Sequence, residues 1–235
     1  MHIEQGQEVA QSMSKPILTE IEIDAIGEVL NISMGAAATA VSAMLDKQVI
    51  ITTPKVSVQS MEHINYRSLE PAMIVKITFV SGITGSNVMV FRQSDMQMIL
   101  NQLMGIDGPP SDDFVFDELS MSAAGEVMNQ MMGSSATALS EFLGKSINIS
   151  TPTTGILDES YTFQDAIGMD EGDNIVTVVF DLSIGDNMSS EFMSVMSVDL
   201  AKMIINQFIS DQDLPIPHGG QETPAAMGYR QVLIR

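Results

Sequence analysis

The sequence contains one segment twice, and this duplication limits the folds open to the chain. Residues 26–54 read IGEVLNISMGAAATAVSAMLDKQVIITTP, and residues 124–152 read AGEVMNQMMGSSATALSEFLGKSINISTP. The two align without a gap at an offset of 98, and 15 of the 29 positions are identical. Chance does not produce such identity in two segments of ordinary composition, so the chain is a tandem duplication. We expect its two halves to be related by a pseudo-two-fold axis.

Weaker similarity extends the repeat in both halves. IVKITF at 74–79 matches IVTVVF at 175–180, and ILNQLM at 99–104 matches IINQFI at 204–209. The offset grows to 101 and then 105, which indicates insertions in the second half, one of them in the acidic loop around 158–173. We assign repeat one to 18–105, repeat two to 116–210, and a single domain to 18–210. Residues 1–17 are interpreted as an N-terminal extension, and residues 211–235, without periodicity, as a tail or linker.

The sequence of each half predicts the same order of helices and strands. A long helix, a strand that follows it directly, two further strands and a short amphipathic helix are expected. The long helices are placed at 19–45 and 117–144, the later strands at 73–81, 86–92, 174–184 and 189–197, and the short helices at 94–104 and 198–210. Thr19 with Glu22 forms a capping box, and Asp117 can cap alone. The predicted fold class is α/β (α+β), with two long helices packed on a mainly antiparallel sheet of about six strands.

Charge and composition exclude several classes of function. The net charge is −20, with 10 basic residues against 30 acidic ones, so binding to nucleic acid or to an anionic membrane surface is not expected. The chain has no cysteine, and its three histidines show no metal-ligand spacing, so no metal site is expected. No run approaches 18 apolar residues and no signal peptide is visible, which favours a cytoplasmic location.

Each long helix carries a polar stripe beside its apolar one. A helix advances about 100° per residue, so positions i, i+4 and i+7 share one side. In the first helix these positions hold Asp24, Glu28 and Asn31, and the second helix repeats them as Ser122, Glu126 and Asn129. The apolar core stripe of the first helix is expected to comprise Ile23, Ile26, Leu30, Met34, Ala37, Val41 and Leu45.

Two glycines interrupt each long helix, namely Gly27 and Gly35 in the first and Gly125 and Gly133 in the second. Glycine costs about 0.5–1 kcal/mol relative to alanine inside a helix, so these positions call for close approach of another backbone. Packing of the two helices on each other, or on the sheet, is the structural explanation. Similarly, the glutamates could be solvated helix charges, and the asparagines could be buried amides that satisfy backbone groups. The residues alone leave both explanations open.

A spacing signature connects these positions with a known family. Asp24-x3-Glu28-x2-Asn31-x22-Pro54 and Ser122-x3-Glu126-x2-Asn129-x22-Pro152 both resemble the active-site signature of the CheC/CheX/FliY phosphatases of bacterial chemotaxis. The resemblance covers residues 18–210, and NISMG at 31–35 with ITTP at 51–54 looks most like the N-terminal part of the FliY branch. That branch usually carries a C-terminal FliN-like domain, which we do not expect in residues 211–235. LTEIEIDAI at 18–26 is similar to a peptide that binds phosphorylated CheY, but we interpret it as the opening of the first helix.

The resemblance implies a reaction and roles for the motif residues. The expected substrate is CheY phosphorylated on aspartate, with Mg²⁺ held by CheY and no cofactor bound by this chain itself. Asn31 or Asn129 would orient a water for in-line attack on phosphorus, and Glu28 or Glu126 would pair with the CheY active-site lysine. Phosphoryl transfer depends mainly on positioning and charge neutralisation, which suits this division of roles.

The remaining motif positions are expected to support the site. Asp24 and Ser122 would make local contacts, and Pro54 and Pro152 would shape the strand after each helix. Because Asp24 adds a charge near an anionic substrate, the second site is favoured as the more active. The resemblance also implies flagellar switch partners of the FliM, FliG and FliN types, and leaves open a peripheral location at the flagellar basal body. The alternative function is a non-catalytic switch scaffold or adaptor that binds CheY or other flagellar proteins.

Overall fold

The computed structural model describes residues 17–52, 54–106, 108–111, 113–157, 161–185 and 188–212. The predicted extension at 1–17 and tail at 211–235 therefore lie almost entirely outside the described residues. The elements in chain order are α1 (Glu20–Leu45), β1 (Val49–Ile51), β2 (Lys55–Ser60), η1 (Met61–His63), η2 (Arg67–Leu69), β3 (Ala72–Ser81), β4 (Gly85–Arg92), α2 (Gln93–Leu103), α3 (Glu118–Phe142), β5 (Asn148–Ile149), β6 (Thr153–Ile156), α4 (Phe163–Ile167), β7 (Asn174–Ile184), β8 (Met188–Ser197) and α5 (Val198–Gln212).

The two long helices begin at the capping residues that the sequence predicts. The Thr19 side chain accepts a hydrogen bond from the Glu22 backbone N–H at 3.3 Å, and the Glu22 carboxylate accepts one from the Thr19 N–H at 2.7 Å. Asp117 accepts from the backbone N–H and the hydroxyl of Ser120, at 2.8 and 2.7 Å. These hydrogen bonds, above all that from the Ser120 hydroxyl, hold the pKa of Asp117 below its usual range. The capping box and the single cap are both confirmed.

The sheet joins the two repeats by exchanging strands between them. The strand order is β1-β7-β8-β4-β3-β5, and every recorded pair among the described residues is antiparallel. β1 and β2 of the first repeat pair with β7 of the second, while β5 and β6 of the second pair with β3 of the first. The order therefore reads the same from either edge when each strand is replaced by its repeat equivalent. The predicted pseudo-two-fold arrangement and fold class are confirmed.

Over the described residues the sheet contains eight strands rather than about six, because each strand that follows a long helix is divided in two. β1 ends at Ile51 and β2 begins at Lys55, with Pro54 between them; β5 ends at Ile149 and β6 begins at Thr153, directly after Pro152. Proline has no N–H to donate to a strand ladder, so pairing is interrupted beside it.

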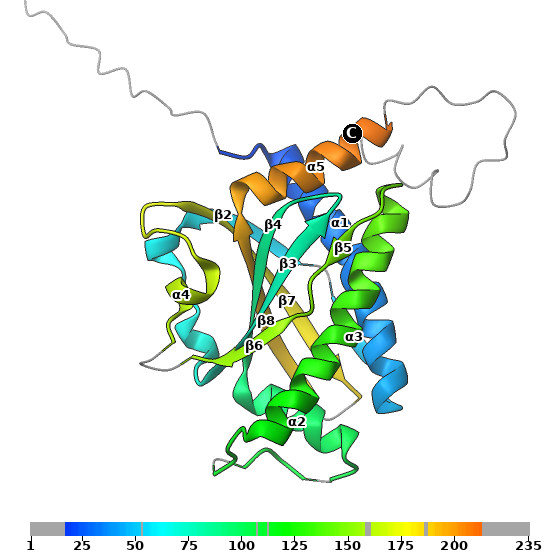
Figure 1. Cartoon of the computed structure of the whole chain (residues 1–235), viewed down its shortest axis with the longest axis vertical. Helices are drawn as coiled ribbons and strands as arrows, with labels where there is room; N and C mark the ends of the chain where they lie inside the picture. Colours follow the sequence, from blue (N-terminus) through cyan, green and yellow to red (C-terminus); the bar gives the residue numbers. More distant parts are fainter. Residues whose placement is uncertain are drawn as a thin grey trace, which may run out of the picture.

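The four longer helices, α1, α2, α3 and α5, cover one face of the sheet. α1 and α3 pack against each other and run antiparallel, with α5 across one end of the layer and α2 at the other (Figure 1). α1 is long and apolar enough to cross a membrane by length and composition, but its apolar side belongs to the main hydrophobic core, as expected of a core helix. Most of the predicted core stripe is buried, including Ile26, Leu30 and Met34, whereas Ile23 is half-buried.

A second, smaller core lies on the other face of the sheet. It contains Phe163 and Ile167 of α4 and Leu69 of η2, packed against alternate residues of β3, β4, β7 and β8. The Phe163 ring stacks on Tyr66 at a centroid distance of 4.8 Å. These short helices were not among the predicted elements, because segments of three to five residues show too little periodicity to be recognised.

Candidate functional site

The motif residues lie on the outward side of the two long helices. Asp24 is exposed on α1, while Glu28 and Asn31 are half-buried; Ser122, Glu126 and Asn129 are all exposed on α3. The opposite sides of both helices hold the buried core residues. Asn129 is therefore not a buried amide that satisfies the backbone. The structure brings the three motif residues of each repeat onto one accessible helix surface.

The glycines of the long helices do not serve packing between the helices. A Cβ added at Gly35, Gly125 or Gly133 would meet no heavy atom within 4 Å, and at Gly27 the nearest atom would be Val56 Cγ2 at 3.5 Å, an ordinary contact. Close internal packing would leave no such space. The structural explanation therefore fails for three of the four glycines, and those positions leave room for a molecule outside the chain.

The C-terminal part of each polar stripe holds the fold together. Thr39 Oγ1 donates to the Gly35 carbonyl at 3.0 Å, and Thr137 makes the same bond to Gly133 at 2.9 Å. Further along α3, Ser140 Oγ accepts from the Ile147 N–H at 3.0 Å, and Ser42 on α1 accepts from the Val49 N–H at 2.8 Å. These two serines tie each long helix to the chain that enters the next strand. Ser42 and Ser140 are thus engaged within the fold, and the part of the stripe open to a partner includes the motif and the glycines Gly35 and Gly133.

The two copies of the motif differ in what surrounds the glutamate. On α3 the Gln130 side-chain amide donates to Glu126 Oε1 at 3.0 Å. The equivalent residue on α1, 98 positions earlier, is Ile32, which has no polar group to offer Glu28. Together with the difference between Asp24 and Ser122, this places the two copies in unequal electrostatic surroundings.

The motif prolines lie apart from the helical stripe. Pro54 is half-buried and Pro152 is buried, each in the interruption between two short strands. This position fits a residue that directs the chain. Within the described ranges, no group of three His, Asp or Glu side chains converges in a way that could hold a metal ion.

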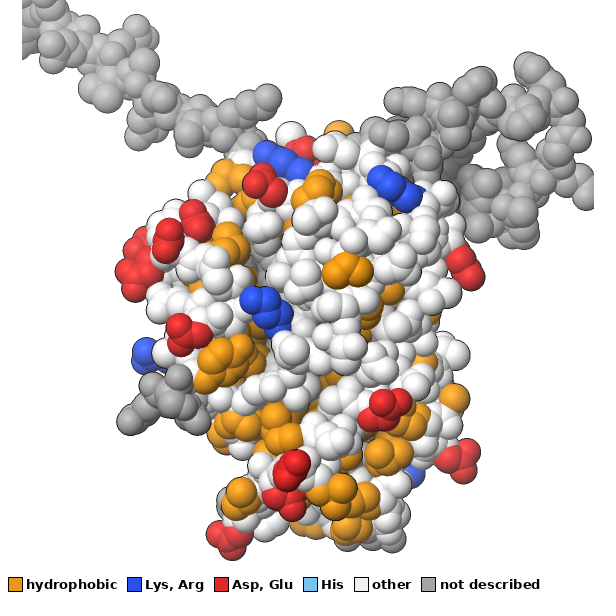
Figure 2. All heavy atoms as spheres, viewed as in Figure 1, with side chains coloured by type: hydrophobic (Ala, Val, Ile, Leu, Met, Phe, Trp, Pro, Cys, Tyr) orange, Lys and Arg blue, Asp and Glu red, His pale blue; other side chains and the backbone are white. Residues whose placement is uncertain are grey.

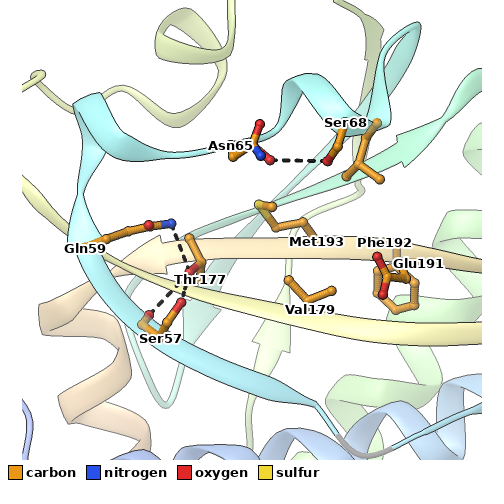
Figure 3. A pocket seen from close by; sticks show the side chains of 10 residues that line it. Ser57, Gln59, Asn65, Ser68, Thr177, Val179, Glu191, Phe192 and Met193 are labelled. Carbon is orange, nitrogen blue, oxygen red and sulfur yellow. Dashed lines mark hydrogen bonds between the residues drawn. The ribbon is translucent and has the colours of Figure 1, made fainter.

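A cavity of about 250 Å³ lies on the other face of the sheet, away from the motif. It is lined by Ser57, Gln59, Asn65, Ser68, Leu69, Thr177, Val179, Glu191, Phe192 and Met193. Figure 3 shows Ser57, Gln59 and Thr177 close together and Asn65 beside Ser68, with Glu191 apart from both groups. The Ser57 and Thr177 hydroxyls are 2.7 Å apart and Gln59 donates to Thr177 at 3.3 Å, so these groups already satisfy each other. Nothing in the sequence indicates this cavity, because its residues come from four separated segments.

Comparison with known proteins matches the chain to one family. The model of the CheC-like family matches residues 21–58 and 119–156, the first parts of the two repeats. The flagellar motor switch phosphatase FliY of Bacillus subtilis (strain 168) is 39% identical over 198 residues, which are 83% of this chain and 51% of that protein. The chain thus spans about half the length of this curated relative.

Solved structures agree with that match. The crystal structure of Thermotoga maritima FliY is 36% identical, with a TM-score of 0.76 over 84% of this chain and 100% of that one. A chain of the FliG–FliM complex of H. pylori has a TM-score of 0.65 over 80% of this chain and 100% of its own, and the FliM middle domain of H. pylori has a TM-score of 0.62 over 81% of this chain and 99% of its own. At 13% and 12% identity, both show a shared fold alone. The chain belongs to the CheC-like family, on the branch that contains FliY.

Proposed function

We propose that this chain is a protein phosphatase that removes the phosphoryl group from the aspartate of phosphorylated CheY, with one site on each long helix. The observation that carries the proposal is the duplicated motif itself, held on the accessible side of both α1 and α3. The name of the B. subtilis relative, a flagellar motor switch phosphatase, supports the same activity. Residues 18–210 act as the phosphatase domain in this proposal.

An exposed helix side suits a substrate whose reactive group lies inside another protein. The open space beside Gly35 and Gly133 allows a partner backbone to lie against the helix one turn beyond Asn31 and Asn129. The carboxamide of either asparagine can donate and accept hydrogen bonds at once, so it can hold a water in line with the phosphorus. The water attacks, the bond between phosphorus and the aspartyl oxygen breaks, and the aspartate and inorganic phosphate are released.

Charge neutralisation comes mainly from the substrate in this scheme. CheY would supply Mg²⁺ and a lysine, and Glu28 or Glu126 would pair with that lysine as the helix docks. Asp24 and Ser122 would support local contacts, and Pro54 and Pro152 would direct the chain behind the helix. Holding a water close to the phosphorus in the correct orientation removes a large part of the activation barrier in reactions of this type.

The second candidate function is a switch scaffold that binds CheY or other flagellar proteins without turnover. The shared fold of FliM, whose structure was solved with FliG, favours this candidate. Docking alone gives no reason for an asparagine in both copies, so we place phosphatase activity first. The phosphatase proposal also includes partners of the FliM, FliG and FliN types and a cytoplasmic location at the flagellar basal body.

Loss of phosphate from purified CheY, phosphorylated with a small-molecule donor, tests the proposal. The chain should accelerate this loss, and Asn31→Ala with Asn129→Ala should abolish the acceleration. Circular dichroism and thermal unfolding should stay unchanged, because Asn129 is exposed and Asn31 is only half-buried. Full acceleration by the double variant would refute the assignment. Stable binding with no acceleration by the wild-type chain would favour the scaffold.

A further inference from the structure

Exposed hydrophobic side chains occur at equivalent positions in front of both motifs. Ile21 on α1 is 68% exposed and Leu119 on α3 is 74% exposed, and they are 98 positions apart, as the motifs are. Ile17 and Val115, also 98 apart, are 41% and 77% exposed. Single exposed apolar residues are common and need no explanation. Exposed apolar residues at equivalent positions of both repeats, found here twice, do need an explanation, because the two halves have diverged at many other positions.

Helix capping does not account for these four residues. In a hydrophobic staple, the residue before the N-cap packs on the residue four positions into the helix. In these two helices the residues before the N-caps are Leu18 and Phe116, and the residues four positions into the helices are Ile23 and Met121. All four belong to the main core or pack against it. Ile21 and Leu119 occupy the second helical position, whose side chain takes no part in a cap or a staple. Their exposure therefore has no explanation within the fold.

The exposed residues continue the motif stripe toward the start of each helix. Ile21, Asp24, Glu28 and Asn31 are spaced by three, four and three residues, as are Leu119 and the three motif residues of α3. At about 100° per residue, these four positions fall within an arc of about 80°. Leu119 lies about 15 Å along the helix axis from Asn129, at about 1.5 Å per residue. One partner protein in contact with the motif can therefore reach the apolar residue as well.

We infer that Ile21 and Leu119, with Ile17 and Val115 beside them, form an apolar docking patch for the phosphorylated receiver protein. This inference rests on the proposed function and names a specificity determinant of the same sites. The occupant is an apolar patch on the receiver surface, beside the acidic pocket that holds the acyl phosphate. At the α3 copy, hydrophobic side chains gather at the end of the molecule where α2 ends and α3 begins (Figure 2). Leu103, the last residue of α2, and Met104, which follows it, are both exposed.

An apolar patch would allow docking in spite of the negative charge on both proteins. The chain carries a net charge of −20, and a carboxylate-rich phosphoryl site gains nothing from approaching such a surface. Apolar contact does not depend on the sign of either surface. Docking at Ile21 or Leu119 would hold the helix in the register that brings Asn31 or Asn129 to the phosphorus.

The test is the Ile21→Ser, Leu119→Ser double variant, assayed by steady-state loss of phosphate from CheY. We expect KM to rise about tenfold or more, as loss of one buried leucine-sized contact per site implies, while kcat changes by less than about twofold. Ile21→Met with Leu119→Met should restore KM. Val80→Ser, at an exposed position at the end of β3 outside the stripe, is the matched control and should leave both parameters unchanged.

Failure of this inference can be separated from failure of the proposed function. If the wild-type chain accelerates phosphate loss and the serine variant keeps the wild-type KM, the docking patch is refuted while the phosphatase assignment stands. If gel filtration shows that the variant loses self-association and KM does not change, the patch is an interface between copies of this chain. If the wild-type chain produces no acceleration that depends on Asn31 and Asn129, the proposed function fails first.

Discussion

Replacing Gly35 and Gly133 by alanine should stabilise the protein and impair its activity. Neither glycine has a positive φ, and an added Cβ would meet nothing within 4 Å at either position. Alanine gains about 1 kcal/mol over glycine in an exposed helix interior, so the double variant should gain about 2 kcal/mol in free energy of unfolding. For a domain of this size that corresponds to a rise in Tm of about 4–8 °C.

The loss of activity follows from the room the methyl groups occupy. Gly35 and Gly133 lie one turn after Asn31 and Asn129. If a partner backbone lies against either glycine, the added methyl group pushes that backbone away from the helix, close to the asparagine. A misplacement of about 1 Å in a reacting group can cost about a hundredfold in rate. The expected result is a roughly hundredfold fall in kcat/KM for phosphorylated CheY in the double variant.

Urea denaturation followed by circular dichroism measures the first effect, and phosphate loss from CheY measures the second. Ser134→Ala, beside Gly133 on α3, is the matched control: it raises helix propensity without adding bulk and should leave activity unchanged. A double variant that is less stable than wild type would mean that the glycines serve internal packing. A more stable variant with full activity would refute the close approach of a partner.

Three further results are expected from individual residues. Ser140→Ala leaves the Ile147 N–H without its acceptor and should lower the free energy of unfolding by about 1–3 kcal/mol, measured in urea. Burial raises the pKa of Asp95, so ionisation of this carboxyl destabilises the fold. The Asp95→Asn variant should therefore become more stable relative to wild type as pH rises above about 4. Urea titrations of both proteins at pH 4 and pH 8 measure this difference in free energy of unfolding. Gln130→Ile releases Glu126 from a surface pair of about 0.2–0.5 kcal/mol and should lower the KM of the second site by about twofold, assayed with the first site disabled.

The repeat and its periodicity predicted most of the fold. The observed bounds of α1, α3 and the four long strands differ from the predicted ones by at most two residues, because caps and alternating apolar residues mark those positions locally. The exchange of β1 and β2 with β5 and β6 was not predicted, since either repeat could pair with its own hairpin without changing a single local preference. Only the packing of both halves together determines which pairing forms.

The candidate site divides in the same way. The spacing of Glu28 and Asn31 was enough to place both on one helix side, and the apolar stripe indicated which side faces the core. Exposure at Ile21 and Leu119 was not predicted, although their spacing places them on the motif side, because an apolar residue in an apolar helix is ordinarily assigned to the core. The contact between Gln130 and Glu126 is compatible with the sequence, but side-chain rotamers decide whether it forms.

The strand exchange has a consequence for how the two sites work. β1 and β2 directly follow the helix of the first site, yet they pair with β7, which belongs to the second repeat. The helix of the second site is followed in the same way by strands that pair with β3. Neither helix is therefore supported by its own repeat alone, and a chain cut between the repeats would leave the strands after each helix without partners. The two repeats thus form one folding unit that presents two antiparallel helices. Mutating the asparagine of one helix should remove that site and leave the structure of the other site intact.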